Sequence, residues 1–153
     1  MNFASLRVIT DDVNRLVDFY ETVTRISAVR YTPQFAELHF PAFALAIGHS
    51  DTVQLFGSGS AHAADNHSLI VEFLADDVDD DYQRLRTLGF EWVQTPTTMP
   101  WANRSILFRD PDGNLVNLFQ PVTDDAIARV RKSRKMTISS AQGRAPIRRH
   151  VPG

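Results

Sequence analysis

A short acidic segment occurs twice in this sequence, each time in a similar setting. Residues 11–14 read Asp-Asp-Val-Asn, and residues 76–79, at an offset of 65, read Asp-Asp-Val-Asp. An apolar, strand-like run precedes each copy, at residues 3–9 and 68–74, and a helical pattern of apolar residues follows each copy. Because aspartate is a favourable helix N-cap, each copy is expected to begin a helix. The repeat therefore predicts two copies of one supersecondary unit.

Each predicted helix is followed by three strand-like segments. The helices are predicted from apolar residues spaced along one helix face, which are Val13, Leu16, Val17 and Tyr20 in the first copy and Val78, Tyr82, Leu85 and Leu88 in the second. The strands are predicted at residues 26–31, 35–40, 43–48, 91–95, 104–108 and 115–121. Gly89 is expected to cap the second helix, residues 95–100 to form a loop, and Asp110–Asn114 to form the turn before the last strand. The chain is therefore predicted to contain the order βαβββ twice.

These elements fit one domain followed by an extension. A chain of 153 residues is long enough for one compact core. We expect the domain to cover residues 1–122, with module one at 1–56, a flexible linker at 57–67 and module two at 68–122. Residues 123–153 then form a basic C-terminal extension.

The extension and the domain carry charges of opposite sign. All 18 acidic residues lie at or before Asp125, so residues 1–125 carry a net charge of −10 and residues 126–153 carry +8. A helix is expected over residues 124–135, because its acidic start and basic end suit the helix dipole. We favour an extension that lies on the acidic body of its own chain or of a partner. The alternative is a basic arm that binds nucleic acid or an anionic membrane surface, although an acidic body would repel a polyanion.

Composition excludes several kinds of site. The chain has no cysteine, which excludes a disulfide framework, a zinc site with thiolate ligands, a cysteine nucleophile and an iron–sulfur cluster held by cysteine. Its apolar runs are shorter than the roughly 20 residues that a membrane span requires. The first residues show no signal-peptide pattern. We therefore expect a soluble, cytoplasmic protein.

Four segments together resemble a known superfamily. They are Leu6–Asp12 (LRVITDD), Phe19–Glu21 (FYE), Glu72–Val78 (EFLADDV) and Phe108–Leu118 (FRDPDGNLVNL). This set resembles the vicinal oxygen chelate superfamily, which includes glyoxalases, bleomycin and fosfomycin resistance proteins and extradiol dioxygenases, over about residues 1–122. The resemblance implies an α+β fold in which two βαβββ modules form an open, barrel-like sheet with the helices on its outer face. It also implies a ligand site on the concave face and a homodimer.

The resemblance also bears on a metal cofactor. Metal-dependent members of the superfamily carry histidines on the first and fifth strands and a glutamate on the last strand. The positions that match here are Ser5, Ile70 and Asn117, with His67 as the alternative for the fifth strand. None of the three matched residues is a good ligand for a divalent metal, so we expect no metal cofactor. The alternative is a divalent metal held by displaced ligands, for which the candidates are Glu37, His39 and Glu72.

Alternation of side chains along the strands places further candidates on the concave face. Arg7 and Glu72 occupy equivalent positions in the two modules. They are expected either to form an ion pair that ties the modules together or to act separately, Arg7 on an anionic ligand group and Glu72 as a general base. The candidate ligand-binding residues are Arg7, Glu72, Trp101, Arg104, Asn117 and Phe119. Glu72 is the one candidate for a catalytic role.

These observations lead to one expected function and two alternatives. We expect a small-molecule-binding protein of the glyoxalase/bleomycin-resistance type without the metal site, which binds an aromatic or amphipathic ligand. The first alternative is an enzyme of the same superfamily, a lyase, isomerase or dioxygenase that depends on a divalent metal or needs no cofactor. The second is a nucleic-acid-associated protein that acts through its basic extension. The expected partners are a small-molecule ligand and a second copy of the chain, with no membrane and no nucleic acid.

Overall fold

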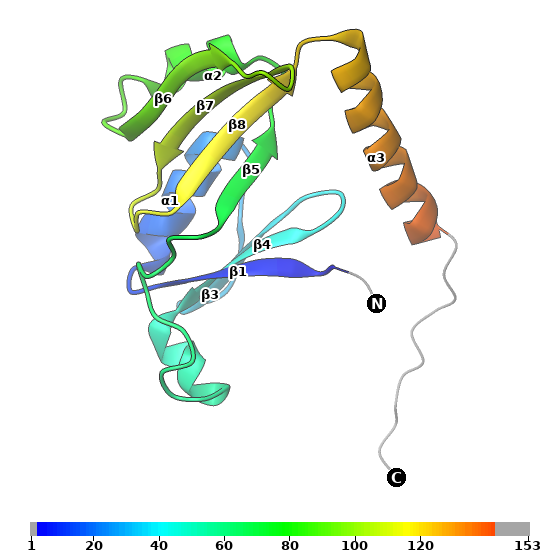
Figure 1. The fold of residues 1–153 in the computed structure, drawn as a ribbon. Coiled ribbons are helices and arrows are strands. Elements are labelled where there is room, and N and C mark those ends of the chain that lie inside the picture. The colour runs from blue at the N-terminus through cyan, green and yellow to red at the C-terminus, as the bar shows by residue number, and fades with distance from the viewer. Residues whose placement is uncertain (1–2, 143–153) are drawn as a thin grey trace.

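The computed structural model describes residues 3–142, and it has the α+β fold and the βαβββ order that the repeat predicts (Figure 1). In chain order the elements are β1 (Ser5–Thr10), α1 (Val13–Thr24), β2 (Val29–Thr32), β3 (Phe35–His39), β4 (Ala44–His49), the 3₁₀ helix η1 (Ser50–Leu55), β5 (Ile70–Leu74), α2 (Val78–Leu85), β6 (Glu91–Thr98), β7 (Asn103–Arg109), β8 (Leu115–Pro121) and α3 (Asp124–Gln142). The helix η1 has no counterpart in the second module and was not predicted.

Each module forms its own four-stranded sheet, and the two sheets share one topology. The strand orders are β1-β4-β3-β2 in module one and β5-β8-β7-β6 in module two. The first and last strands of each module pair in parallel, which sets Arg7 beside Ala46 and Glu72 beside Asn117. Arg7 and Glu72 are therefore equivalent in the structure as well. The sheets do not close into a barrel, and β1 and β5 each lie at a sheet edge.

The two repeated aspartates begin their helices as predicted. The Asp12 carboxylate accepts a hydrogen bond from the Arg15 backbone N–H at 3.0 Å, and Asp77 does the same for Asp80 at 3.0 Å. These caps confirm that the repeated segment encodes a helix start.

The predicted end of the second helix and the loop that follows were wrong. Helix α2 ends at Leu85 with Arg86 as its C-cap, because a tighter turn then follows in which Leu88 N–H donates to the Leu85 carbonyl. Gly89 instead supplies a positive φ of 75° on the way into β6. Strand β6 continues to Thr98, through the segment predicted as a loop. It tolerates Pro96 because it is an edge strand with an irregular register there.

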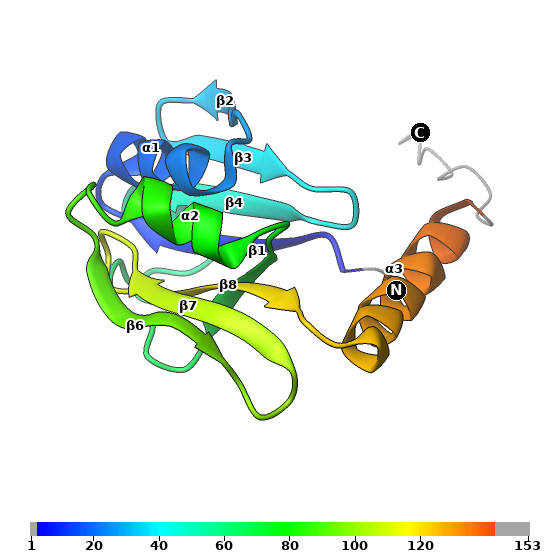
Figure 2. The ribbon, with the colours of Figure 1, turned by 90° about the horizontal axis from the view of Figure 1, so that it is seen from above.

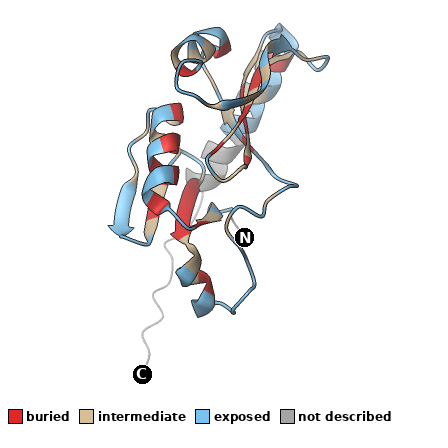
Figure 3. Cartoon of the chain, turned by 90° about the vertical axis from the view of Figure 1, so that its left-hand side faces the viewer, coloured by how far each residue is buried: buried red, intermediate tan, exposed pale blue. Residues whose placement is uncertain are grey.

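One hydrophobic core joins the two modules through α1. This helix lies between the two sheets (Figure 1) and packs on β3 and β4 of its own module. The Phe19 ring also lies 4.8 Å from Phe90 and 6.0 Å from Phe108 of module two, centroid to centroid. Strand β4 is buried along almost its whole length, and buried residues lie along one side of α1 (Figure 3). Each sheet therefore has one face on this shared core and one open face.

Helix α3 is longer than predicted and stands to one side of the sheets (Figures 1 and 2). It is attached through buried Ala126 and through Arg129, which donates to the Trp101 carbonyl at 3.2 Å. Residues 143–153 of the predicted basic extension lie outside the described residues. Within the described part of the chain, no helix has the length and apolar character needed to span a bilayer.

Candidate functional site

The open face of module one displays a cation, two acid–base groups and several aromatic rings. Sheet register places Arg7, Ala46 and Glu37 in one row across β1, β4 and β3, and places Phe35 beside Gly48. The residues on this side of β4, Ala44, Ala46 and Gly48, are small and are covered by the larger side chains of the neighbouring strands. Tyr31 from β2 adds an aromatic ring that is 56% exposed.

Arg7 is held by aromatic rings rather than by a carboxylate. Its guanidinium carbon lies 4.9 Å from the centroid of the Phe35 ring and 5.3 Å from that of Phe56, which are cation–π distances. The stem of Arg7 passes over Gly48, where a Cβ would lie 3.6 Å from Arg7 Cδ, at ordinary contact distance. Among the described residues, the Arg7 side chain has no hydrogen-bond or ion-pair partner.

Beside Arg7, a short chain of polar contacts runs along β2 and β3. Tyr31 Oη and His39 Nε2 are 3.2 Å apart, and His39 Nε2 lies 3.4 Å from Glu37 Oε2. Glu37 and His39, the two displaced metal-ligand candidates of module one, therefore contact each other on this face. They also direct the Glu37 carboxylate toward His39.

The open face of module two carries a second polar group. Asn117 Nδ2 donates to Glu72 Oε1 at 2.8 Å, and the amide oxygen of Asn117 is buried with no partner in the described part of the chain. Ile70 and Leu74, on the same face of β5, are 48% and 37% exposed. Phe119 follows Asn117 on this face of β8. The face thus combines apolar surface with an unused hydrogen-bond acceptor.

The ion pair considered for Arg7 and Glu72 is absent from the described residues, and the two residues lie on different sheets. Of the two alternatives that the sequence left open for these residues, the ion pair that ties the modules together was therefore wrong. The ties between the modules come instead from α1. Arg15 Nη2 lies 2.7 Å from Asp112 Oδ1, and Arg84 donates to the Thr22 carbonyl at 2.8 Å.

This arrangement predicts that Glu72→Gln leaves stability unchanged, within about 0.5 kcal/mol, because an exposed side chain loses no ion pair. The matched control is Asp112→Asn, which makes the same carboxylate-to-amide change. It removes the charge that pairs with Arg15 at an aspartate side chain that is 5% exposed, so it is expected to cost about 1 kcal/mol. Urea unfolding of both variants tests the comparison. A larger loss for Glu72→Gln than for Asp112→Asn would contradict it.

The donor set does not fit the metal of the metal-dependent relatives. The three matched positions supply the hydroxyl of Ser5, the alkyl chain of Ile70 and the amide of Asn117. Glu37 and His39 lie on the module-one sheet and Glu72 on the other, and no cluster of three His, Asp or Glu side chains suited to a metal occurs in residues 3–135, for which side chains are described. Amides and alkyl groups are poor ligands for the metals that imidazole and carboxylate sets bind.

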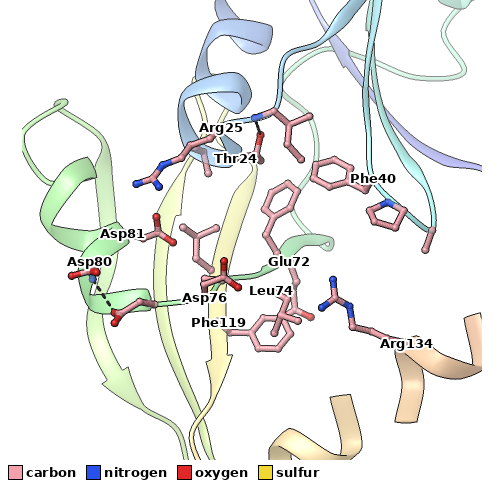
Figure 4. A pocket seen from close by; sticks show the side chains of 18 of the residues that line it. Thr24, Arg25, Phe40, Glu72, Leu74, Asp76, Asp80, Asp81, Phe119 and Arg134 are labelled. Carbon is pink, nitrogen blue, oxygen red and sulfur yellow. Dashed lines mark hydrogen bonds between the residues drawn. The ribbon is translucent and has the colours of Figure 1, made fainter. Parts of the chain in front are cut away.

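A pocket of about 690 Å³ lies where the two modules and α3 meet (Figure 4). The end of α1, the β3–β4 turn, the chain from β5 into α2 and Arg134 of α3 line it. Its apolar walls include Phe40 and Phe119, and its carboxylates include Glu72 and Asp76. Because Glu72 and Phe119 also belong to the open face of module two, the pocket reaches round the free edge of β5. Sequence reasoning missed this pocket because its walls come from segments far apart in the chain.

Two candidate ligand-binding residues lie away from the open faces. Trp101 lies in the turn between β6 and β7 and is 57% exposed. Arg104 shares the helix-covered side of β7 with Ile106 and Phe108, and its Nη2 donates to Asp79 Oδ1 at 2.7 Å. This hydrogen bond lowers the pKa of Asp79. Of the six ligand-binding residues predicted from the sequence, four therefore lie on open faces: Arg7, Glu72, Asn117 and Phe119.

The turn Asp110–Asn114 has a structural role. The buried Asp110 carboxylate accepts hydrogen bonds from Tyr20 Oη at 2.8 Å and from Asn114 Nδ2 at 2.7 Å, and from two backbone N–H groups at 2.9 Å. Burial raises the pKa of Asp110 despite these bonds, and it also raises the pKa of Tyr20. The turn thus locks module two onto α1.

Comparisons with known proteins agree with this architecture. The model of the Glyoxalase/Bleomycin resistance protein/Dioxygenase superfamily matches residues 2–118. A solved glyoxalase/bleomycin resistance protein/dioxygenase from Nocardioides is similar, with 25% identity and a TM-score of 0.66, over 81% of this chain and 85% of the other. A family enzyme from Burkholderia phytofirmans PsJN has a TM-score of 0.70 at 15% identity, over 80% of this chain and all of the other (100%). No curated protein matches the sequence.

A virulence protein from Salmonella typhimurium is also similar, with 25% identity and a TM-score of 0.62, over 80% of this chain and 98% of the other. The family match covers both modules and stops before α3. It includes the turn from Asp110 to Asn114, on which the resemblance in the sequence mainly rests. The chain therefore belongs to the glyoxalase/bleomycin resistance protein/dioxygenase superfamily.

Proposed function

We propose that this protein binds a small amphipathic or aromatic molecule, without the metal of its metal-dependent relatives and as a homodimer. The observation that carries the proposal is the state of the two open faces. Each combines exposed apolar side chains with a polar group that can bond to a ligand, Arg7 on one face and the exposed Glu72 carboxylate, which Asn117 orients, on the other. A ligand that bonds to such a group and covers the apolar side chains around it gains affinity from both.

The same faces support the second copy. Strands β1 and β5 each have a free edge, and the open faces expose Val29, Ile70 and Leu74 to solvent. Exposed apolar surface beside an unpaired strand edge favours association with another chain. A second copy that covers part of these faces would enclose the ligand between protein surfaces, as binding pockets for small molecules require.

Native mass spectrometry tests two parts of the proposal at once, the absence of a metal and the homodimer. The protein is purified without chelator and measured before and after soaking in Mn²⁺, Fe²⁺, Ni²⁺ and Zn²⁺. We expect the mass of a dimer and only trace metal under every condition. Retention of one metal ion per subunit would contradict the metal-independent function, and a monomer at micromolar concentration would contradict the dimer.

A cofactor-free enzyme with Glu72 as general base is the second candidate function. The hydrogen bond from Asn117 favours it, because it orients an exposed carboxylate on an open face. Glu72→Gln distinguishes the two functions once a ligand is known. A binding protein keeps its ligand chemically unchanged in both forms, whereas an enzyme converts the ligand in the wild type and only binds it in the variant.

A further inference from the structure

We infer that the ligand carries a carboxylate attached to a flat apolar body, and that the aromatic-held guanidinium of Arg7 selects it. This inference rests on the proposed function, since it describes what the open face of module one would recognise. It specifies the chemical class of the ligand and the residue that recognises it. Three observations support it.

The first observation is that Arg7 has no carboxylate partner in an acidic protein. Residues 1–125 carry a net charge of −10, and several arginines pair with acids, as Arg30 does with Asp18 at 3.1 Å, whereas Arg7, like Arg86 at the end of α2, has no acidic partner among the described residues. Glu37 is in the same row of the sheet but two strands away, which is about 10 Å, and its carboxylate lies toward His39. The positive charge of Arg7 is therefore available to a ligand.

The second observation is how the guanidinium is held. The guanidinium carbon lies over the Phe35 and Phe56 rings at 4.9 and 5.3 Å from their centroids, so two aromatic side chains hold it by cation–π contact. Aromatic rings accept no conventional hydrogen bond, and among the described residues the Arg7 N–H groups have no hydrogen-bond partner. These groups form a planar fork that matches a carboxylate. Because the rings already fix the side chain, less conformational entropy is lost when the carboxylate binds.

The third observation concerns what surrounds the charge. Within the described residues, Arg7 is the only arginine or lysine on the open face of module one. One cation on this face suits a monoanion better than a phosphate dianion, which would need more positive charge. Phe56 is 74% exposed and Tyr31 56% exposed, so both rings present surface to a flat apolar group. Together these features favour an aromatic or polyene carboxylate.

Three probes with the same ring system and different charges test this inference. They are 2-naphthoate, neutral 2-naphthylmethanol and 2-naphthylmethylammonium, each titrated calorimetrically into the full-length protein at neutral pH. We expect naphthoate to bind about tenfold or more tightly than the other two. Arg7→Met is expected to remove that preference and to leave the affinity for naphthylmethanol unchanged. Phe56→Leu is expected to weaken naphthoate binding severalfold, since the ring both holds Arg7 and contacts the ligand.

Arg86→Met is the matched control. It makes the same change of charge at an exposed arginine at the end of α2 that has no side-chain partner among the described residues. We expect it to leave all three affinities unchanged, which separates a local contact from the general effect of one lost positive charge.

The outcomes distinguish this inference from the function on which it rests. Equal binding of the three probes would overturn the choice of a carboxylate but leave a small-molecule-binding protein. Binding of none would overturn both. Naphthoate binding that survives in Arg7→Met would overturn the role of Arg7. The same conclusion would follow if native mass spectrometry showed an altered oligomeric state of that variant while its naphthoate affinity stayed that of the wild type.

Discussion

Replacing Phe108 by alanine is expected to lower the free energy of unfolding by about 3–5 kcal/mol. The side chain is fully buried, and it joins the parts of the core that come from different modules. Its ring stacks on Phe90 at 5.5 Å and lies 5.1 Å from Trp92 and 6.0 Å from Phe19 of α1, centroid to centroid. Alanine would leave a cavity that the closely packed rings of Phe19, Phe90 and Trp92 cannot readily fill.

Urea unfolding followed by tryptophan fluorescence and by circular dichroism measures this loss. Phe3→Ala is the matched control, because that ring is 69% exposed and its removal is expected to cost no more than about 0.5 kcal/mol. Wild-type transitions should coincide by both probes, since one core spans both modules. A loss below about 1 kcal/mol for Phe108→Ala would show that the modules do not depend on this contact.

Tyr20→Phe is expected to cost about 1.5–3 kcal/mol at neutral pH, the usual range for a hydrogen bond to a charged group. Tyr20 is fully buried, and its Oη is one of two donors to Asp110 Oδ2, the other being Asn114 Nδ2. Without the hydroxyl, a buried carboxylate oxygen keeps a single donor. No shape change accompanies the loss, because phenylalanine fills the same space.

The cost of Tyr20→Phe is expected to grow with pH. Burial raises the pKa of Asp110 in the folded wild type, so folding favours its protonated form, and this contribution is greatest in acid and is lost as pH rises through the raised pKa. The Tyr20 hydrogen bond favours the charged form, so its removal raises the folded-state pKa further. The folded variant then binds a proton more readily than the folded wild type, while the unfolded chains bind alike. The difference in stability therefore increases with pH.

Urea unfolding of both proteins at about pH 4 and about pH 7 measures this dependence. Tyr31→Phe is the control, because that tyrosine is 56% exposed and its hydroxyl contacts His39 on the open face. It is expected to leave stability unchanged at both pH values. A cost of Tyr20→Phe that is the same or smaller at the higher pH would exclude a charged Asp110 as the acceptor.

The role of Asp110 explains how the superfamily architecture persists in a chain without the usual ligand residues. The Asp110–Asn114 turn is the most specific part of the resemblance, and its side chains hold module two onto α1 rather than reach either open face. The turn is needed for the fold itself. The positions that would bind a metal, which lie on the open faces, can change without loss of this packing.

The amino-acid sequence determined the elements of this fold through local patterns. The repeat at an offset of 65 residues predicted two equivalent modules, and Asp12 and Asp77 began both helices as expected. Strand β8 spans the predicted Leu115–Pro121. These features could be predicted because N-capping and the alternation of apolar side chains act over only a few residues.

Contacts between distant residues were decided only by the tertiary structure. Arg7 and Glu72 could be placed on equivalent strand positions, but the pairing of Arg7 with Phe35 and Phe56, and of Glu72 with Asn117, depends on how the strands and η1 pack. The sequence also did not indicate that Arg104 lies on the helix-covered side of β7, where it donates a hydrogen bond to Asp79. A long side chain reaches several neighbours with similar energies, and only the packed arrangement of the two sheets around α1 selects among them.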